Sequence, residues 1–79
     1  MKPVGDVHVE ELFGIGKRYD IRCSRGQRVS IVVHKDGVRE FYAFESDDEE
    51  EPTAIIRLEE AEARKVGAIL GGTYFDNND

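Results

Sequence analysis

The sequence contains very little of what a disulfide, a thiolate metal site or a membrane span requires. Its single cysteine, Cys23, excludes an intramolecular disulfide and a cysteine-based zinc site. No run approaches the roughly 18 apolar residues of a transmembrane helix, and the N-terminus lacks a hydrophobic signal region. We therefore expect a soluble, cytoplasmic protein that contacts a membrane only through a partner.

Tryptophan is absent, and the apolar content of the chain is modest. The 79 residues, 39% of them hydrophobic, suffice for one small domain but not for two. A core of this size is thin, and modest stability is expected.

Acidic residues exceed basic residues, but the excess is local. The chain has 17 acids and 11 bases, for a formal charge of −6. Residues 45–51 hold six of these acids, whereas the bases concentrate between residues 17 and 39. The charge argues against nucleic acid, where bases must replace counterions. We expect 45–52 to be a solvated, flexible loop, because its carboxylates repel one another.

The hydrophobic pattern predicts an α+β domain, an antiparallel β-meander of about five strands with one C-terminal helix packed on one face. Period-two alternation indicates strands, and an apolar stripe with acids in its first turn indicates a helix ending at Gly71-Gly72. The expected strands are 4–11, 17–23, 28–34, 38–44 and 53–58, and the expected helix is 59–70.

The turns determine which side chains share a face. A three-residue loop with a left-handed Gly26 would set Tyr19 opposite Ile31. At Asp36-Gly37 two registers are open. A two-residue turn leaves Phe41 on the reverse face, and a three-residue loop brings it inward. We favour the two-residue turn, because it buries two aromatic residues, Tyr42 and Phe44, instead of one.

That register leaves three apolar residues on the face without the helix, which indicates a protein-contact surface. Scattered surface apolar residues are the plainer interpretation. The predicted interface consists of Val32, Phe41 and Ile55, together with His34, Arg18 and Arg22.

No group of residues indicates catalysis, a cofactor or a metal. The two histidines, His8 and His34, fall on outward faces, and a zinc site needs three or so converging ligands; pH sensing at the interface stays open for His34. Cys23 shares a strand face with apolar residues. Gly14-Ile15-Gly16 precedes a strand and not a helix, so it is a bend with its apolar neighbours turned inward and not a phosphate loop. We therefore predict a non-enzymatic module.

Three stretches in this order resemble the N-terminal domain of the soluble regulatory subunit of bacterial potassium/proton antiporters. They are residues 12–19 (LFGIGKRY), 34–42 (HKDGVREFY) and 58–72, which ends in GAILGG. The departures are Phe13 where proline is usual, Glu59 at the helix cap, and a longer acidic run.

The resemblance implies a regulatory domain over residues 1–72, with a tail at 73–79. It implies assembly as a homodimer and coupling to a membrane antiporter subunit, peripheral to the inner membrane. Members continue into a TrkA-C domain, where a nucleotide such as cyclic di-AMP is expected to bind; this sequence stops before it. A general protein-interaction module, or a small nucleic-acid-binding domain, shares the residue-level features.

Overall fold

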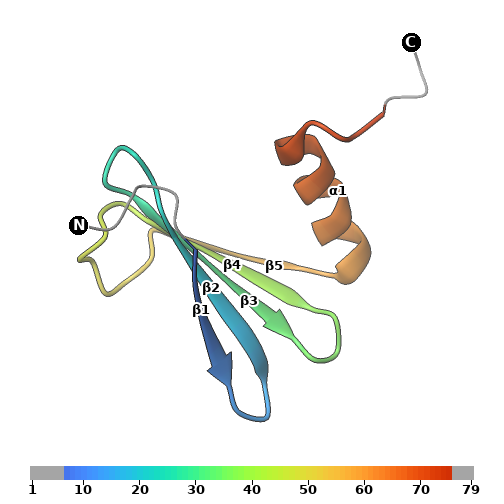
Figure 1. Cartoon of the computed structure of the whole chain (residues 1–79), viewed down its shortest axis with the longest axis horizontal. Helices are drawn as coiled ribbons and strands as arrows, with labels where there is room; N and C mark the ends of the chain where they lie inside the picture. The colour runs from blue at the N-terminus through green and yellow to red at the C-terminus, as the bar shows by residue number, and fades with distance from the viewer. Residues whose placement is uncertain (1–6, 76–79) are drawn as a thin grey trace.

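The computed structural model describes residues 7–75 and contains one antiparallel sheet followed by one helix (Figure 1). The sheet is formed, in chain order, by β1 (Val7–Leu12), β2 (Gly16–Arg22), β3 (Arg28–His34), β4 (Arg39–Phe44) and β5 (Ala54–Leu58). The helix α1 (Glu60–Gly71) follows β5. The predicted α+β meander is confirmed. Positions 4–6 of the first expected strand and positions 76–79 of the expected tail lie outside the described residues.

The ends of α1 follow from local sequence. The Glu59 amide donates to Glu62 Oε1 at 2.8 Å, which satisfies one of the backbone donors at the helix start. Gly72 takes a left-handed conformation with φ of 78° and closes the helix, as the glycine pair predicted.

The loop between β2 and β3 has the predicted form. Gly26 is left-handed at φ 86°, and the register sets Tyr19 opposite Ile31 and Ile21 opposite Val29. These pairs place the apolar residues of both strands on one face, as expected from the three-residue loop.

The favoured register between β3 and β4 is wrong, and the alternative is found. The His34 amide donates to the Val38 carbonyl at 2.8 Å, so residues 35–37 form a three-residue loop, with Gly37 at φ 98°. Phe41 therefore lies opposite Ile31, and Tyr42 lies opposite Ser30. One extra loop residue moves every later side chain to the other face.

The sheet consequently has two chemically distinct faces, here called the apolar face and the polar face. Cross-strand rows on the apolar face are Val7–Ile21–Val29–Ala43–Ala54 and Val9–Tyr19–Ile31–Phe41–Ile56. Rows on the polar face are His8–Asp20–Ser30–Tyr42–Ile55 and Glu10–Arg18–Val32–Glu40–Arg57.

The most buried side chains of the sheet belong to the polar face. Val32 and Phe44 are 8% exposed, and Ser30 is 5% exposed. The bend between β1 and β2 contributes nothing to this small core, because Phe13 is fully exposed and Ile15 is 48% exposed. The expectation that the apolar residues of the bend turn inward is therefore wrong.

The helix lies on the side of the apolar face but packs loosely against it. Figure 1 shows α1 standing off the sheet beside the end of β5, and none of its residues is buried. An apolar groove of about 320 Å³ separates the two, with Phe41 and Leu58 on the sheet side and Val66 and Leu70 on the helix side. Much of the apolar face is left open.

Candidate interaction surfaces

The polar face forms a hollow of about 560 Å³ lined by arginines, acids and a few apolar side chains. Strand alternation explains the arginines: Arg18 and Arg22 lie four positions apart on β2, so both point to this face. Arg28 of β3 lies opposite Arg22 of β2 and points to the same face.

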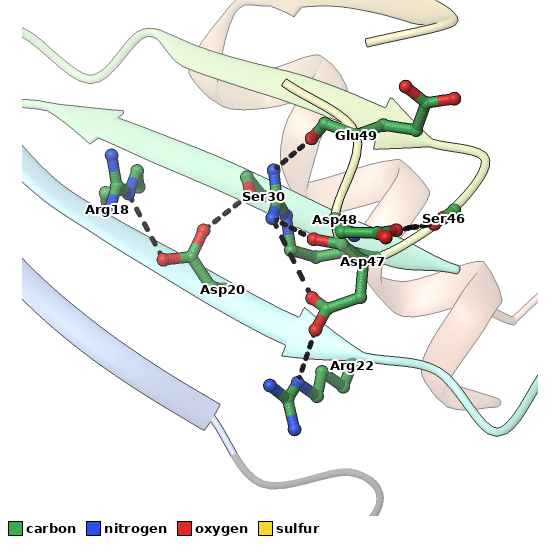
Figure 2. A network of polar contacts seen from close by, with 9 residues as sticks. Arg18, Asp20, Arg22, Ser30, Ser46, Asp47, Asp48 and Glu49 are labelled. Carbon is green, nitrogen blue, oxygen red and sulfur yellow. Dashed lines mark hydrogen bonds and ion pairs between the residues drawn. The ribbon is translucent and has the colours of Figure 1, made fainter. Parts of the chain in front are cut away.

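Asp47 binds the acidic segment, residues 45–52, to Arg22 and Arg28 (Figure 2). Its carboxylate lies 2.8 Å from Arg22 Nε and 3.7 Å from Arg28 Nη1. Arg28 Nη1 also donates to the Asp47 carbonyl at 2.8 Å, and the Asp47 amide donates to the Gly26 carbonyl at 2.9 Å. The expectation that the whole of 45–52 is solvated is thus wrong at Asp47, where attraction to the arginines outweighs repulsion among the carboxylates of the loop. The mobility of the segment stays a prediction.

A second set of contacts fixes the middle of the same face. The Ser30 hydroxyl donates to Asp20 Oδ1, which explains how a buried hydroxyl is satisfied. Arg18 donates through Nε to Asp20 at 3.2 Å and through Nη2 to Glu10 at 2.6 Å. These side chains are held by one another, which suits recognition by shape and charge.

Glu40 is the centre of a third polar cluster. Its Oε1 accepts from His34 Nε2 at 2.8 Å and from the Tyr42 hydroxyl at 3.2 Å, and Arg57 reaches Oε2 at 3.4 Å. The hydrogen bond from His34 is the main cause that lowers the pKa of Glu40 below its ordinary value. Burial, followed by the charge of Glu40, raises the pKa of Tyr42.

Replacing Glu40 with Gln is expected to destabilise the domain at pH 7 by about 1 kcal/mol. Hydrogen bonds to charged groups contribute about 1.5–3 kcal/mol when buried, and the partial exposure of Glu40 reduces this value. A lowered pKa means that the carboxylate stabilises the fold above its unfolded pKa and loses this effect as the pH falls through the folded value. The difference in urea-unfolding free energy between E40Q and the parent should therefore shrink between pH 7 and pH 3. A difference independent of pH would contradict the role of the charge.

The structure separates the residues of the predicted interface. Val32, Ile55, Arg18, Arg22 and His34 lie on the polar face, whereas Phe41 lies on the apolar face. Val32 is buried, and Ile55 is 59% exposed. The predicted register at Asp36-Gly37 placed Phe41 on the same face as the other five residues. Because that register is incorrect, the six residues do not form one contiguous surface. A contact role for these residues remains a prediction.

The sequence reasoning missed the larger feature, which is the openness of the apolar face. Val7, Val9 and Ile56 on that face are between 50% and 53% exposed, and Ile69 and Leu70 of the helix more so. Contiguous exposed apolar surface of this kind marks interaction sites. The pairing of Asp47 with arginines was also missed. The opposite charges of the acidic run and of the basic residues on either side of Gly26 could have indicated it.

The described residues offer little for chemistry at a reacting centre. Within residues 7–75 no three His, Cys, Asp or Glu side chains are grouped to hold a metal ion. The helix found there is too short and too polar to cross a bilayer. What the arrangement presents is one charged hollow and one open apolar face.

Comparison with known proteins shows the family of the chain. Residues 5–74 match the family model described as the K(+)/H(+) antiporter subunit KhtT, N-terminal domain. The chain belongs to this family. The match spans all five strands and the helix, so the family assignment applies to the whole described fold.

Three bacterial relatives are similar over almost the same stretch. The chain is 42% identical over 69 residues to the uncharacterized protein YrvC of Bacillus subtilis, and 37% identical over 70 residues to the K(+)/H(+) antiporter subunit KhtT of that species. It is 33% identical over 69 residues to the ammonium/H(+) antiporter subunit AmhM of Alkalihalophilus pseudofirmus. The matches cover 87–89% of this chain but 41–42% of each relative, so the chain spans about two fifths of their length.

Proposed function

We propose that this chain is a non-catalytic regulatory and assembly domain of a cation/proton antiporter subunit, which self-associates and couples to the membrane transporter at the cytoplasmic side. The observation that carries the proposal is the family match over residues 5–74, with two relatives named as subunits of proton antiporters. The transport chemistry would then reside in the membrane subunit, and a nucleotide ligand would be bound by a TrkA-C domain.

The open apolar face supports a role in assembly. A sheet of five strands is roughly 20 Å wide and one helix covers about half of that, since strands lie about 4.8 Å apart and a helix is about 10 Å across. The uncovered part carries Val7 and Val9, which are half exposed. Burial against another protein would remove this surface from water.

The chain offers a matched pair of positions to test which face contacts the transporter. Ile55 and Ile56 are neighbours on β5, are 59% and 51% exposed, and point to opposite faces. Aspartate at either position should leave the fold intact, because neither side chain is buried. The two variants therefore differ mainly in the face that is altered.

The experiment measures potassium-dependent proton exchange in inside-out vesicles that contain the antiporter of the same cell, with and without the protein in its natural full length. Exchange should change several-fold when the protein is added. Ile56→Asp should abolish that response, whereas Ile55→Asp should retain it. The reverse result would restore the interface around Ile55, Arg18, Arg22 and His34. Absence of any response to the unaltered protein would refute the proposed function.

A further inference from the structure

One end of the polar face concentrates positive charge on two adjacent strands. Arg22 at the end of β2 lies directly opposite Arg28 at the start of β3, and like charges at such positions repel each other. Arg25 in the loop between them adds a third cation, and residues 21–35 contain no Asp or Glu. An anion at this end of the sheet is therefore favoured, because it offsets the repulsion.

The two opposed arginines share a single carboxylate in the structure (Figure 2). Among residues 7–75, Asp47 is the acid that forms ion pairs with them, at 2.8 Å from Arg22 Nε and 3.7 Å from Arg28 Nη1. One negative charge thus faces two positive charges. The balance is reversed further along the hollow, where two acids pair with the one guanidinium of Arg18.

The hydrogen-bond donors of the pair are also incompletely used. Within residues 7–75 the ion pair of Arg22 involves Nε alone, and Arg28 Nε is buried without a hydrogen-bond partner. Other groups fix the position of Arg28, because its guanidinium carbon lies 3.9 Å from the centre of the Phe44 ring and its Nη1 donates to the Asp47 carbonyl. Two guanidiniums held side by side in this way form a receptor for an anion with several oxygens.

We propose that Arg22 and Arg28 form a binding site for a phosphate monoester, and that the Asp47 carboxylate occupies this site as an internal substitute for the ligand. The phosphate group of a monoester carries a charge between about −1.5 and −2 at pH 7 and presents three acceptor oxygens, so it matches two guanidiniums better than one carboxylate does. A phosphodiester carries a single charge and lacks this advantage over Asp47. The site lies within the hollow of about 560 Å³, a volume suited to a small organic molecule.

Displacement of the Asp47 carboxylate requires little rearrangement. The side chains of Asp47 and Arg22 are 36% and 57% exposed, and ion pairs at such exposure are weak. The main chain of the segment is held separately, because the Asp47 amide donates to the Gly26 carbonyl and Arg28 donates to the Asp47 carbonyl. Rotation of one side chain would free both guanidiniums while Arg28 keeps its place.

The remaining acids of the segment oppose a second anion and set the strength of the site. Glu50 also lines the hollow, and residues 45–51 carry six acids in all. Binding is therefore expected to be weak in the unaltered chain and to tighten when Asp47 is neutralised. Asp48 belongs to the same segment, but its carboxylate accepts from the Ser46 hydroxyl instead of from an arginine, so it provides a matched control.

Titration with two small phosphates tests the site. Methyl phosphate carries the monoester group and dimethyl phosphate the diester group, and NMR shifts of the amides at 22–28 and 46–48 report binding to the 79-residue chain. Asp47→Ala should bind methyl phosphate about fivefold more tightly than the parent, as release of one surface ion pair implies. Asp48→Ala removes the same charge and should change the affinity less than about twofold, because solvent and salt screen it. Dimethyl phosphate should bind Asp47→Ala several-fold more weakly than methyl phosphate.

Two arginine variants locate the ligand. In the Asp47→Ala background, Arg22→Ala should abolish the gain in affinity, whereas Arg25→Ala, which removes the same charge from the exposed loop, should keep most of it. Arg22 is exposed, so its variant should fold. Vesicles containing phosphatidic acid distinguish the source of the group. Sedimentation of Asp47→Ala with these vesicles, lost on Arg22→Ala, would assign a lipid headgroup, and its absence would assign a soluble phosphate.

Three results would overturn the proposal. They are equal affinities of the Asp47→Ala and Asp48→Ala chains, equal losses for the Arg22 and Arg25 variants, and no binding of methyl phosphate by Asp47→Ala. None of these readouts depends on transport, so they fail or succeed independently of the antiporter assignment.

Discussion

Substituting Gly16 with Ala is expected to cost the domain at least about 3 kcal/mol of unfolding free energy, at the upper end for a single substitution. A Cβ built at Gly16 would lie 1.9 Å from the carbonyl oxygen of Val33 and 2.9 Å from its carbonyl carbon. Both atoms are backbone within the central strand β3, so no side-chain rotation relieves the overlap. Gly16 also has φ of 155°, a conformation that side chains disfavour.

Gly67 of α1 provides the matched control. A Cβ at Gly67 meets nothing within 4 Å, and alanine is a better helix former than glycine by about 1 kcal/mol. Gly67→Ala should therefore be neutral or slightly stabilising in urea unfolding. If Gly16→Ala unfolds at the same urea concentration as the parent, the close approach of β2 and β3 at this point is incorrect.

Phe44→Ala is expected to show the second large effect, a loss of about 3–4 kcal/mol, the usual range for a truncated buried phenylalanine. Phe44 is 8% exposed at the end of β4. The guanidinium carbon of Arg28 lies 3.9 Å from the centre of its ring, in cation–π geometry. The same Arg28 donates to the Asp47 carbonyl, so the ring supports the contact that anchors the acidic segment.

Two further variants separate these contributions. Phe44→Leu keeps apolar volume but removes the ring, and should lose less than Phe44→Ala. Phe13→Ala is the control, because Phe13 is fully exposed at the first bend and its loss should change stability by less than about 0.5 kcal/mol. Urea unfolding followed by tyrosine fluorescence measures all three. Equal losses for the Phe13 and Phe44 variants would contradict the placement of the core on the polar face.

The position of Phe44 illustrates why the register could not be derived from hydrophobicity. Counting buried aromatic residues favoured a two-residue turn at Asp36-Gly37, because Tyr42 and Phe44 would then join Ile31. In the structure both side chains lie on the polar face instead. Arg28 covers the ring of Phe44, and the Tyr42 hydroxyl donates a hydrogen bond to Glu40. Aromatic residues of β4 therefore lie on both faces of the sheet. The alternation of apolar and polar residues along this strand does not show which of them face the helix.

The acidic segment shows a similar limit. Repulsion among its carboxylates is evident from the sequence, but attraction to Arg22 and Arg28 depends on the fold. Those arginines and Asp47 are separated by about 20 to 25 positions in the chain. They meet only because the end of β2, the start of β3 and the segment after β4 lie at the same end of the antiparallel strands. The sequence shows that acids and arginines can attract one another. Only the fold determines that Asp47 is the acid that pairs with Arg22 and Arg28.

Local patterns in the chain were sufficient for the elements, their order and the loop at Gly26, because alternation, left-handed glycines and helix-end residues act within a few positions of one another. The family resemblance rests on the same stretches and is confirmed by the match over residues 5–74. The tertiary structure alone decided the face on which Phe41 lies, the anchoring of Asp47 and the looseness of α1. These depend on the length of one loop and on pairings between distant strands, where a shift of one residue reverses every side chain that follows.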